Sequence, residues 1–121
     1  MLLVHHMLGH FKMDLKAKAE QYFETFSSKD LDGLASMFTD DIRLRDWTGD
    51  ATGKEKVLTA NQDIFDAVDT IQVTPLTLYQ EGNTVIAEIE IEVNGDEKLM
   101  VVDVIDYDDN GLITSIRAYK G

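Results

Sequence analysis

Asp103 is the residue whose type and position point most directly to chemistry. It interrupts the apolar alternation of its segment, so that a carboxylic acid shares a predicted strand face with Val101 and Ile105. An ionised carboxylate without a partner on such a face costs several kcal/mol. Asp103 is therefore expected to be protonated, to be paired, or to be kept there for a function.

Tyr22 and Asp46 are two further polar residues on apolar faces. Tyr22 belongs to the apolar stripe of a predicted helix, and Asp46 ends a predicted strand on the same face as Ile42. Each also has a structural interpretation: Tyr22 as a half-buried core tyrosine, and Asp46 as the cap of the turn at residues 47–49. Together with Asp103, both side chains are expected to face one apolar interior.

Three predicted helices carry the first half of this interior. The first covers residues 13–27, and Asp30 can cap a short second helix. A capping box of Thr52 and Glu55 predicts the start of the third. Their buried faces are expected to comprise Leu15, Ala19, Tyr22, Phe23 and Phe26, then Leu31, Leu34, Ala35 and Phe38, then Val57, Ala60, Ile64 and Val68.

Residues 41–46 alternate as a strand, and a meander of further strands follows the third helix. In the first strand of the meander the apolar parity changes at Pro75, which indicates a bulge or bend on an edge strand. The strands of the meander are expected over residues 70–80, 84–93, 97–107 and 112–120.

The turns of the meander set its register. A three-residue loop at residues 94–96 pairs Lys98 with Glu92, whereas a two-residue loop would place like charges opposite each other. A four-residue loop before the last strand then places Asp103 opposite Ile116. This register keeps Asp103 on the apolar face of the meander.

The order of elements predicts an α+β fold. Three N-terminal helices would pack on a strongly curved antiparallel sheet, and this arrangement forms a cone with an apolar pocket inside. The side chains expected to line that pocket, around Tyr22, Asp46 and Asp103, are Phe38, Trp47, Ile89, Ile91, Val101, Ile105, Ile116 and Ala118.

The opposite face of the sheet also carries apolar residues, so it is expected to be partly covered. Two-fold pairing is the commonest way to cover such a patch, and a homodimer through this open face is expected. Its apolar centre would consist of Ile86, Met100, Val102, Val104 and Ile113.

The composition limits the classes of function. The 121 residues suffice for one domain, and the 44% that are hydrophobic suffice for a core. The net charge of −12 disfavours binding to nucleic acid and to anionic membranes. The absence of cysteine excludes disulfides, zinc–thiolate sites and thiol nucleophiles. The expected partner is a small hydrophobic ligand. With no spanning segment and no signal peptide evident, the expected location is the cytoplasm.

Residues 1–12 match no periodic pattern and are expected to be a flexible extension of a single domain over residues 13–121. They carry the three histidines of the chain, His5, His6 and His10. Such a cluster could bind a metal, but no carboxylate or cysteine completes a site nearby, so no metal site is expected.

Several short segments, early and late in the chain, form one pattern. They are Gln21-Tyr22-Phe23, Lys29-Asp30-Leu31-Asp32-Gly33-Leu34, Met37-Phe38-Thr39-Asp40-Asp41, Arg45-Asp46, Val102-Asp103-Val104, Asp109-Asn110-Gly111 and Ser115-Ile116-Arg117-Ala118. The pattern resembles the superfamily of ketosteroid isomerase, SnoaL-like proteins and nuclear transport factor 2. The resemblance covers roughly residues 13–121 and implies the nuclear transport factor 2-like, or cystatin-like, roll.

The resemblance also implies roles for three residues. Asp46 would be the general base that takes a proton from the carbon next to a carbonyl. Tyr22 and a neutral Asp103 would donate hydrogen bonds to the enolate oxygen. The implied reaction is the isomerisation of an unsaturated ketone or a SnoaL-like aldol cyclisation, and it uses no cofactor.

Fold alone does not decide between an enzyme and its alternatives. A non-catalytic module of the same fold, for binding a hydrophobic ligand or for oligomerisation, stays open. A cavity that reaches Tyr22, Asp46 and Asp103 together favours the enzyme. A cavity plugged by Trp47 or Phe38 favours the other two interpretations.

Overall fold

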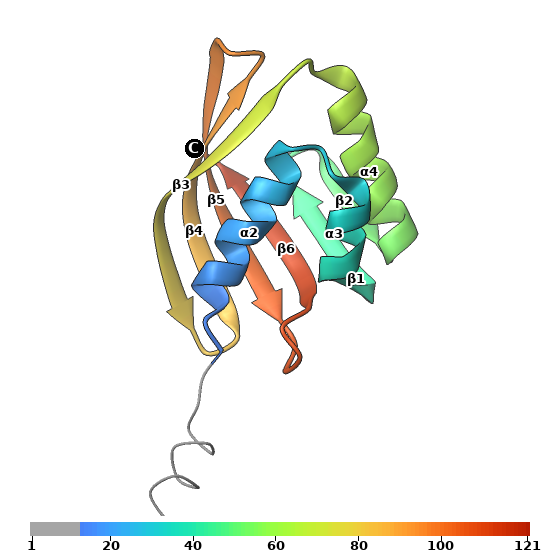
Figure 1. Ribbon diagram of the computed structural model, residues 1–121, viewed down its shortest axis with the longest axis vertical. Helices are drawn as coiled ribbons and strands as arrows, with labels where there is room; N and C mark the ends of the chain where they lie inside the picture. The colour runs from blue at the N-terminus through green and yellow to red at the C-terminus, as the bar shows by residue number, and fades with distance from the viewer. Residues whose placement is uncertain (1–12) are drawn as a thin grey trace, which may run out of the picture.

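The structure is a computed structural model that describes residues 13–121. These residues form three helices and six strands, with the helices on one side of a single curved sheet (Figure 1). The helices are α2 (Leu15–Ser27), α3 (Leu31–Met37) and α4 (Lys54–Ala67). The strands are β1 (Phe38–Asp46), β2 (Gly49–Thr52), β3 (Ile71–Glu81), β4 (Thr84–Val93), β5 (Glu97–Tyr107) and β6 (Ile113–Lys120).

The α+β class and the helix-covered curved sheet are confirmed. The N-terminal extension and its histidines, His5, His6 and His10, lie outside the described residues. No helix within residues 13–121 is long and apolar enough to cross a membrane.

An aspartate caps each of the first two helices, as predicted for the second, while the first begins at Leu15 and not at residue 13. The Asp14 side chain accepts a hydrogen bond from the Ala17 amide at 3.1 Å and so caps α2. Asp30 caps α3 in the same way, by accepting from the Gly33 amide at 2.9 Å. The buried side of α2 comprises Leu15, Ala19, Tyr22 and Phe23, which lie against the sheet.

The predicted capping box at the start of α4 is wrong. Thr52 belongs to β2, and the N-cap residue is Gly53. No side chain forms a capping hydrogen bond at this end of α4. Gly53 has a φ of +96°, a conformation that glycine adopts most easily, and its amide donates to the Ile42 carbonyl at 2.7 Å. The turn out of β2 therefore starts α4, because backbone pairing with β1 replaces the side-chain cap.

The buried stripe of α4 also differs from the prediction. Val57 is buried as expected, but the other buried positions are Asn61 and Phe65, whereas the predicted positions Ala60, Ile64 and Val68 are only half-buried. Asn61 lies four residues after Val57 and four before Phe65, so all three occupy one face of the helix. A polar side chain is thus placed on the helix face that packs inward.

The sheet is mixed, which corrects the prediction of a purely antiparallel one. The strand order is β2-β1-β6-β5-β4-β3, and β1 pairs parallel with β6. Hairpin turns impose antiparallel pairing on neighbouring strands, but β1 and β6 are far apart in the chain and no turn fixes their relative direction. The short strand β2, which the sequence does not predict, forms a hairpin with β1.

β3 is an edge strand with an irregularity at its proline, as predicted. Its pairing with β4 shifts between Pro75 and Thr77. Leu76 is left out of the ladder and is 50% exposed. The bulge reverses the side-chain parity of the strand, which is why the apolar pattern changes there.

The meander has the predicted register in its first hairpin and a shifted register in its second. Lys98 pairs with Glu92, as expected. Asp103 pairs with Ala118 and not with Ile116. The loop is one residue longer than predicted, since Tyr107 pairs with Ile113, and an irregularity between Asp106 and Tyr107 shifts the last strand by one residue more. Because side chains alternate with a period of two, Asp103 keeps its predicted face.

The same irregularity changes the position of Ile113. The alternation predicts it on the open face of the sheet, but Ile113 is 1% exposed and belongs to the core. The extra residue between Ile113 and Ser115 in the ladder with β5 reverses the parity before Ile116. The open face therefore lacks one of its five predicted apolar residues.

Candidate active site

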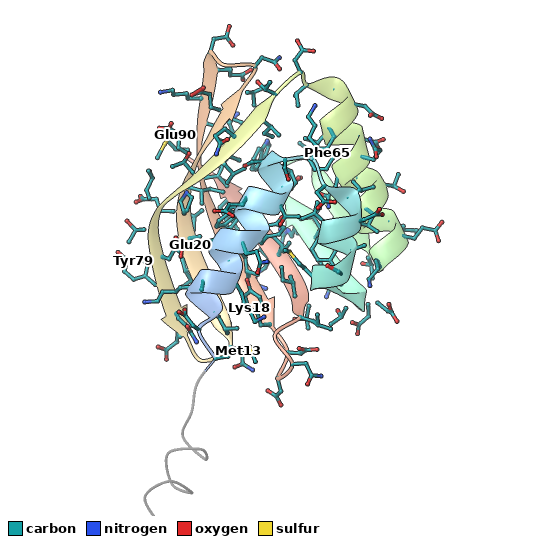
Figure 2. The ribbon with its side chains drawn as sticks, viewed as in Figure 1. Met13, Lys18, Glu20, Phe65, Tyr79 and Glu90 are labelled. Atoms are coloured by element: carbon teal, nitrogen blue, oxygen red, sulfur yellow. The ribbon has the colours of Figure 1, made fainter. Side chains whose placement is uncertain are left out.

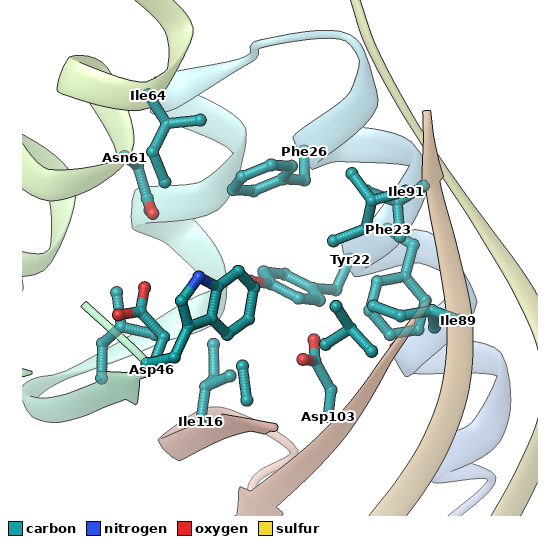
Figure 3. Close-up of a pocket in the computed structure, with 15 residues that line it drawn as sticks. Tyr22, Phe23, Phe26, Asp46, Asn61, Ile64, Ile89, Ile91, Asp103 and Ile116 are labelled. Carbon is teal, nitrogen blue, oxygen red and sulfur yellow. The ribbon is translucent and has the colours of Figure 1, made fainter. Parts of the chain in front are cut away.

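A cavity of about 100 Å³ lies between the helices and the inner face of the sheet. Figure 3 shows side chains from α2, α4 and the strands converging on it. Its walls are mostly apolar, and its polar groups are Tyr22, Asp46, Asn61 and Asp103. The apolar lining consists of Phe23, Phe26, Leu44, Trp47, Ile64, Val73, Ile89, Ile91, Val101, Ile116 and Ala118.

Asp103 projects into this cavity from the middle of β5. It is 7% exposed, and the structure shows no ion pair for it within residues 13–121. Burial raises the pKa of Asp103 to about 7, and the negative charge of Asp46 adds to the rise. A carboxylic acid that keeps its proton near neutral pH can donate a hydrogen bond.

Tyr22 reaches the cavity from α2 and lies beside Asp103 (Figure 3). Its ring packs among aromatic rings, with centroids 5.3 Å from Phe23, 6.2 Å from Phe26 and 6.3 Å from Phe38. Burial raises the pKa of Tyr22 well above its usual value, and the charge of Asp103 raises it further. The hydroxyl is therefore a neutral donor next to a second neutral donor.

Asp46 is the last residue of β1, and it enters the hairpin turn to β2. Its Oδ1 accepts from the Thr48 amide at 2.8 Å, from the Thr48 hydroxyl at 2.6 Å and from the Gly49 amide at 3.1 Å. These bonds close the turn and hold the carboxylate in one orientation. The same side chain lines the cavity, so the structural interpretation of Asp46 and a chemical one are compatible.

Trp47 follows Asp46 in the turn and forms part of the cavity wall. The residue is 47% exposed, so one side of the indole meets solvent. Lys120 Nζ lies 6.0 Å from the ring centroid, within the range of a cation–π contact. Trp47 therefore stands at the opening of the cavity and leaves space inside it.

The structure brings Tyr22, Asp46 and Asp103 to one cavity. Phe38 and Ile105, which the sequence also places in the wall, do not line it. Both are buried in the core, where Phe38 packs behind the Tyr22 ring. The other predicted wall residues, Trp47, Ile89, Ile91, Val101, Ile116 and Ala118, do line the cavity.

Asn61 is a polar residue of the cavity that the sequence analysis misses. It is 3% exposed, and its Nδ2 has no hydrogen-bond partner within the described residues. The spacing of four residues from Val57 could have indicated that Asn61 lies on the inward face of the helix. Within residues 13–121, no group of three or more His, Cys, Asp or Glu side chains could hold a metal ion.

Solved structures with the same fold include proteins of several bacteria. An NTF2-like protein of unknown function from Cytophaga hutchinsonii is 13% identical, with a TM-score of 0.76 over 93% of this chain and 94% of that one. A "putative ketosteroid isomerase" from Kribbella flavida is 24% identical, with a TM-score of 0.77 over 88% and 77% of the two chains. These similarities establish the NTF2-like, cystatin-like fold.

A third structure, described as a "putative isomerase of the SnoaL-like family", comes from Agrobacterium tumefaciens. It is 12% identical, with a TM-score of 0.77 over 90% of this chain and 99% of that one. A comparison with curated proteins finds no match. The model of the SnoaL-like domain matches residues 19–116, which include Tyr22, Asp46 and Asp103. Because this match covers most of the length of the chain, the chain belongs to the SnoaL-like domain family.

Proposed function

We propose that the protein is a small-molecule acid/base enzyme of the ketosteroid isomerase or SnoaL-like type. Asp46 takes a proton from the carbon next to a carbonyl of a small hydrophobic substrate. Tyr22 and protonated Asp103 donate hydrogen bonds to the enolate oxygen that forms. The observation that carries this proposal is the meeting of these three side chains in one largely apolar cavity.

The pair of neutral donors is what the proposed enolate requires. As the proton leaves carbon, negative charge builds up on the carbonyl oxygen. Hydrogen bonds from Tyr22 and Asp103 stabilise that charge strongly, because both donors are buried and water does not compete with them. The raised pKa of both groups keeps them protonated while they donate.

Asp46 supplies the base in this scheme. Its Oδ1 is held by the turn, while Oδ2 takes no part in those bonds and accepts the proton. In an isomerisation, Asp46 returns the proton to a different carbon of the enolate. In an aldol cyclisation, the enolate carbon bonds to a second carbonyl carbon, whose oxygen receives a proton.

The size of the cavity supports a small substrate. Sites for drug-sized ligands measure roughly 300–1,000 Å³. The cavity here is about 100 Å³, and its wall includes the half-exposed Trp47. A single ring or a short chain fits this space, so we propose a substrate of that size and not a fused multi-ring one.

The test is proton transfer in a minimal substrate. We expect the wild-type protein to convert 3-cyclohexen-1-one into the conjugated ketone, followed by ultraviolet absorbance. The Asp46→Asn variant should keep its fold but lose about 10²–10⁴-fold in rate, because an amide cannot accept the proton. The control is Asp50→Asn, which removes an exposed carboxylate on the neighbouring strand β2 and should leave the rate unchanged. Equal rates for wild type and Asp46→Asn would refute the base assignment.

The three hydrogen bonds to Asp46 Oδ1 favour one alternative, a non-catalytic module that binds a hydrophobic ligand. In that case Asp46 serves only the turn. Asp46→Asn would then lower the melting temperature, and the wild-type protein would bind a phenol in the cavity without transferring any proton. An oligomerisation module, the other alternative, would bind neither phenol nor ketone.

A further inference from the structure

Asn61 is the one polar residue of the cavity to which the proposed mechanism gives no role. Its side chain descends from α4 toward the cavity, on the side of Asp46 and across from Asp103 (Figure 3). The residue is 3% exposed, yet within residues 13–121 its Nδ2 has no hydrogen-bond partner. Its neighbours on α4, Val57 and Phe65, are buried apolar residues.

A buried amide without a partner destabilises a fold, and native structures rarely contain one without a reason. An apolar residue at this position would continue the stripe of α4 between Val57 and Phe65. The amide can be satisfied from the cavity, which it lines. A group that occupies the cavity is therefore the natural partner of Asn61.

The surroundings indicate the chemistry of that partner. A carboxylamide carries one donor end and one acceptor end, and a hydroxyl can pair with either of them. An anionic group is disfavoured, because Asp46 lines the same cavity and the chain has a net charge of −12. The partner is thus a neutral oxygen on an otherwise apolar molecule.

We propose that Asn61 binds a second polar group of the substrate, a hydroxyl placed away from the carbonyl that Tyr22 and Asp103 hold. The substrate class is then a small hydroxy-ketone, with one oxygen at each end of the cavity. This inference rests on the proposed function for the position of the carbonyl. Asn61 acts as a specificity and positioning residue, and takes no part in proton transfer.

The test uses two phenols that differ in one group. A phenol resembles the enolate and is expected to place its oxygen at Tyr22 and Asp103. 4-Ethylphenol and 4-(hydroxymethyl)phenol have the same number of heavy atoms, but the second carries a hydroxyl where the first carries a methyl group. Isothermal titration would give the affinity of both for the wild-type protein and for Asn61→Leu and Asn61→Ala.

We expect both Asn61 variants to lose affinity for 4-(hydroxymethyl)phenol relative to 4-ethylphenol, by about fivefold to tenfold, the usual size of one neutral hydrogen bond. Comparing the two probes cancels the change in cavity volume, which leucine and alanine alter in opposite directions. The matched control is Ile64→Val, on the same helix and lining the same cavity, which should affect both probes alike.

Stability separates this role from a structural one. If the Asn61 amide is unsatisfied until a ligand binds, Asn61→Leu should melt at or above the wild-type temperature. A melting temperature several degrees below wild type would mean that the amide bonds within the fold, and it would overturn the inference.

The probes also separate this inference from the proposed function. If both phenols bind the wild-type protein but Asn61→Leu and Asn61→Ala change their affinities equally, the hydroxyl site is refuted while the enolate site stands. If neither phenol binds the wild-type protein, the enolate site fails and the inference fails with it.

Discussion

At the level of single residues, Asp103 links the proposed chemistry to stability. Burial raises its pKa from 3.8 to about 7, with a further contribution from the charge of Asp46. Folding therefore favours the protonated form, and the ionised form destabilises the folded state. Below pH 4 the residue is protonated in both the folded and the unfolded chain. Well above pH 7 it is ionised in both.

We predict that wild type loses stability relative to Asp103→Asn as the pH rises from about 4 to 7. In that window the folded state binds more protons than the unfolded state, so the free energy of unfolding falls with pH. The difference between the two proteins should grow by up to roughly 4 kcal/mol, because asparagine does not titrate. Urea unfolding at several pH values measures it.

The comparison isolates Asp103 because all other groups titrate in both proteins. A difference in stability that stays constant from pH 4 to 7 would contradict the prediction. Carbon-13 NMR of the Asp103 carboxyl gives an independent measurement. A midpoint near 4 would mean that the residue is ionised at neutral pH, and it could not then donate to an enolate.

At the level of elements, Lys29 joins the end of α2 to the end of α4. Its Nζ donates to the carbonyls of Phe65 at 2.9 Å, Val68 at 2.7 Å and Asp69 at 3.1 Å. The last carbonyls of a helix lack partners within the helix, and a positive charge there also interacts favourably with the helix dipole. Lys29 therefore anchors the helix that carries Asn61 and Ile64 into the cavity.

Lys29→Met should lower the free energy of unfolding by about 1–3 kcal/mol, because methionine keeps the aliphatic chain but cannot donate. Hydrogen exchange should accelerate most at the C-terminal end of α4. Lys16→Met is the matched control, since Lys16 is exposed on α2. Equal effects of the two substitutions would show that the contacts of Lys29 add nothing.

The sequence predicted most elements, and the exceptions share a physical cause. β2 consists of Gly49-Asp50-Ala51-Thr52, which has no apolar alternation, and only pairing with β1 makes it a strand. The parallel contact of β1 with β6 joins segments far apart in the chain, which no local pattern reports. Both exceptions therefore depend on pairing with another strand: β2 pairs with its hairpin neighbour β1, and β1 pairs with the distant β6.

The positions of the candidate site residues were predictable where they depend only on which face of a strand the side chain occupies. Asp103 was placed on the correct face despite a two-residue error in the last hairpin, because that error preserves the parity. Ile113 was placed on the wrong face because one extra residue in the strand reverses the parity. Asn61 was not predictable in this way, because the apolar pattern that marks an inward helix face does not include a polar residue.

At the level of the whole molecule, the open face of the sheet carries an exposed apolar patch. Tyr79, for example, projects on the side away from the helices and is 61% exposed (Figure 2). The patch is composed of Tyr79, Ile86, Met100, Val102 and Tyr119. Charged residues share this face with the patch. Arg45 pairs with Arg117 across β1 and β6, and Glu88 and Glu90 lie on β4.

We propose that two copies of the chain pair through this face. A two-fold axis through the patch would bring the arginines of each copy to the glutamates of the other, while the apolar residues meet at the centre. Val102 lies in the middle of the patch, so Val102→Glu should convert the dimer into a monomer in sedimentation experiments. High salt should weaken the wild-type dimer, since part of the attraction is between exposed charges.

The control is Ala17→Glu, which adds the same charge on an exposed position of α2, away from the patch. It should leave the dimer intact. A wild-type protein that sediments as a monomer at micromolar concentration would rule out this assembly, and so would a dimer that both substitutions leave unchanged.

The parallel pairing of β1 with β6 also determines when the cavity can form during synthesis. β1, which ends in Asp46, leaves the ribosome early, but its partner β6 follows only after α4 and all the other strands. Until then β1 has only the short β2 beside it. Such a contact between distant segments slows folding. Asp46 and Asp103 can therefore come together only in the last stage of folding, after the meander is complete, so a nascent chain lacks the candidate site.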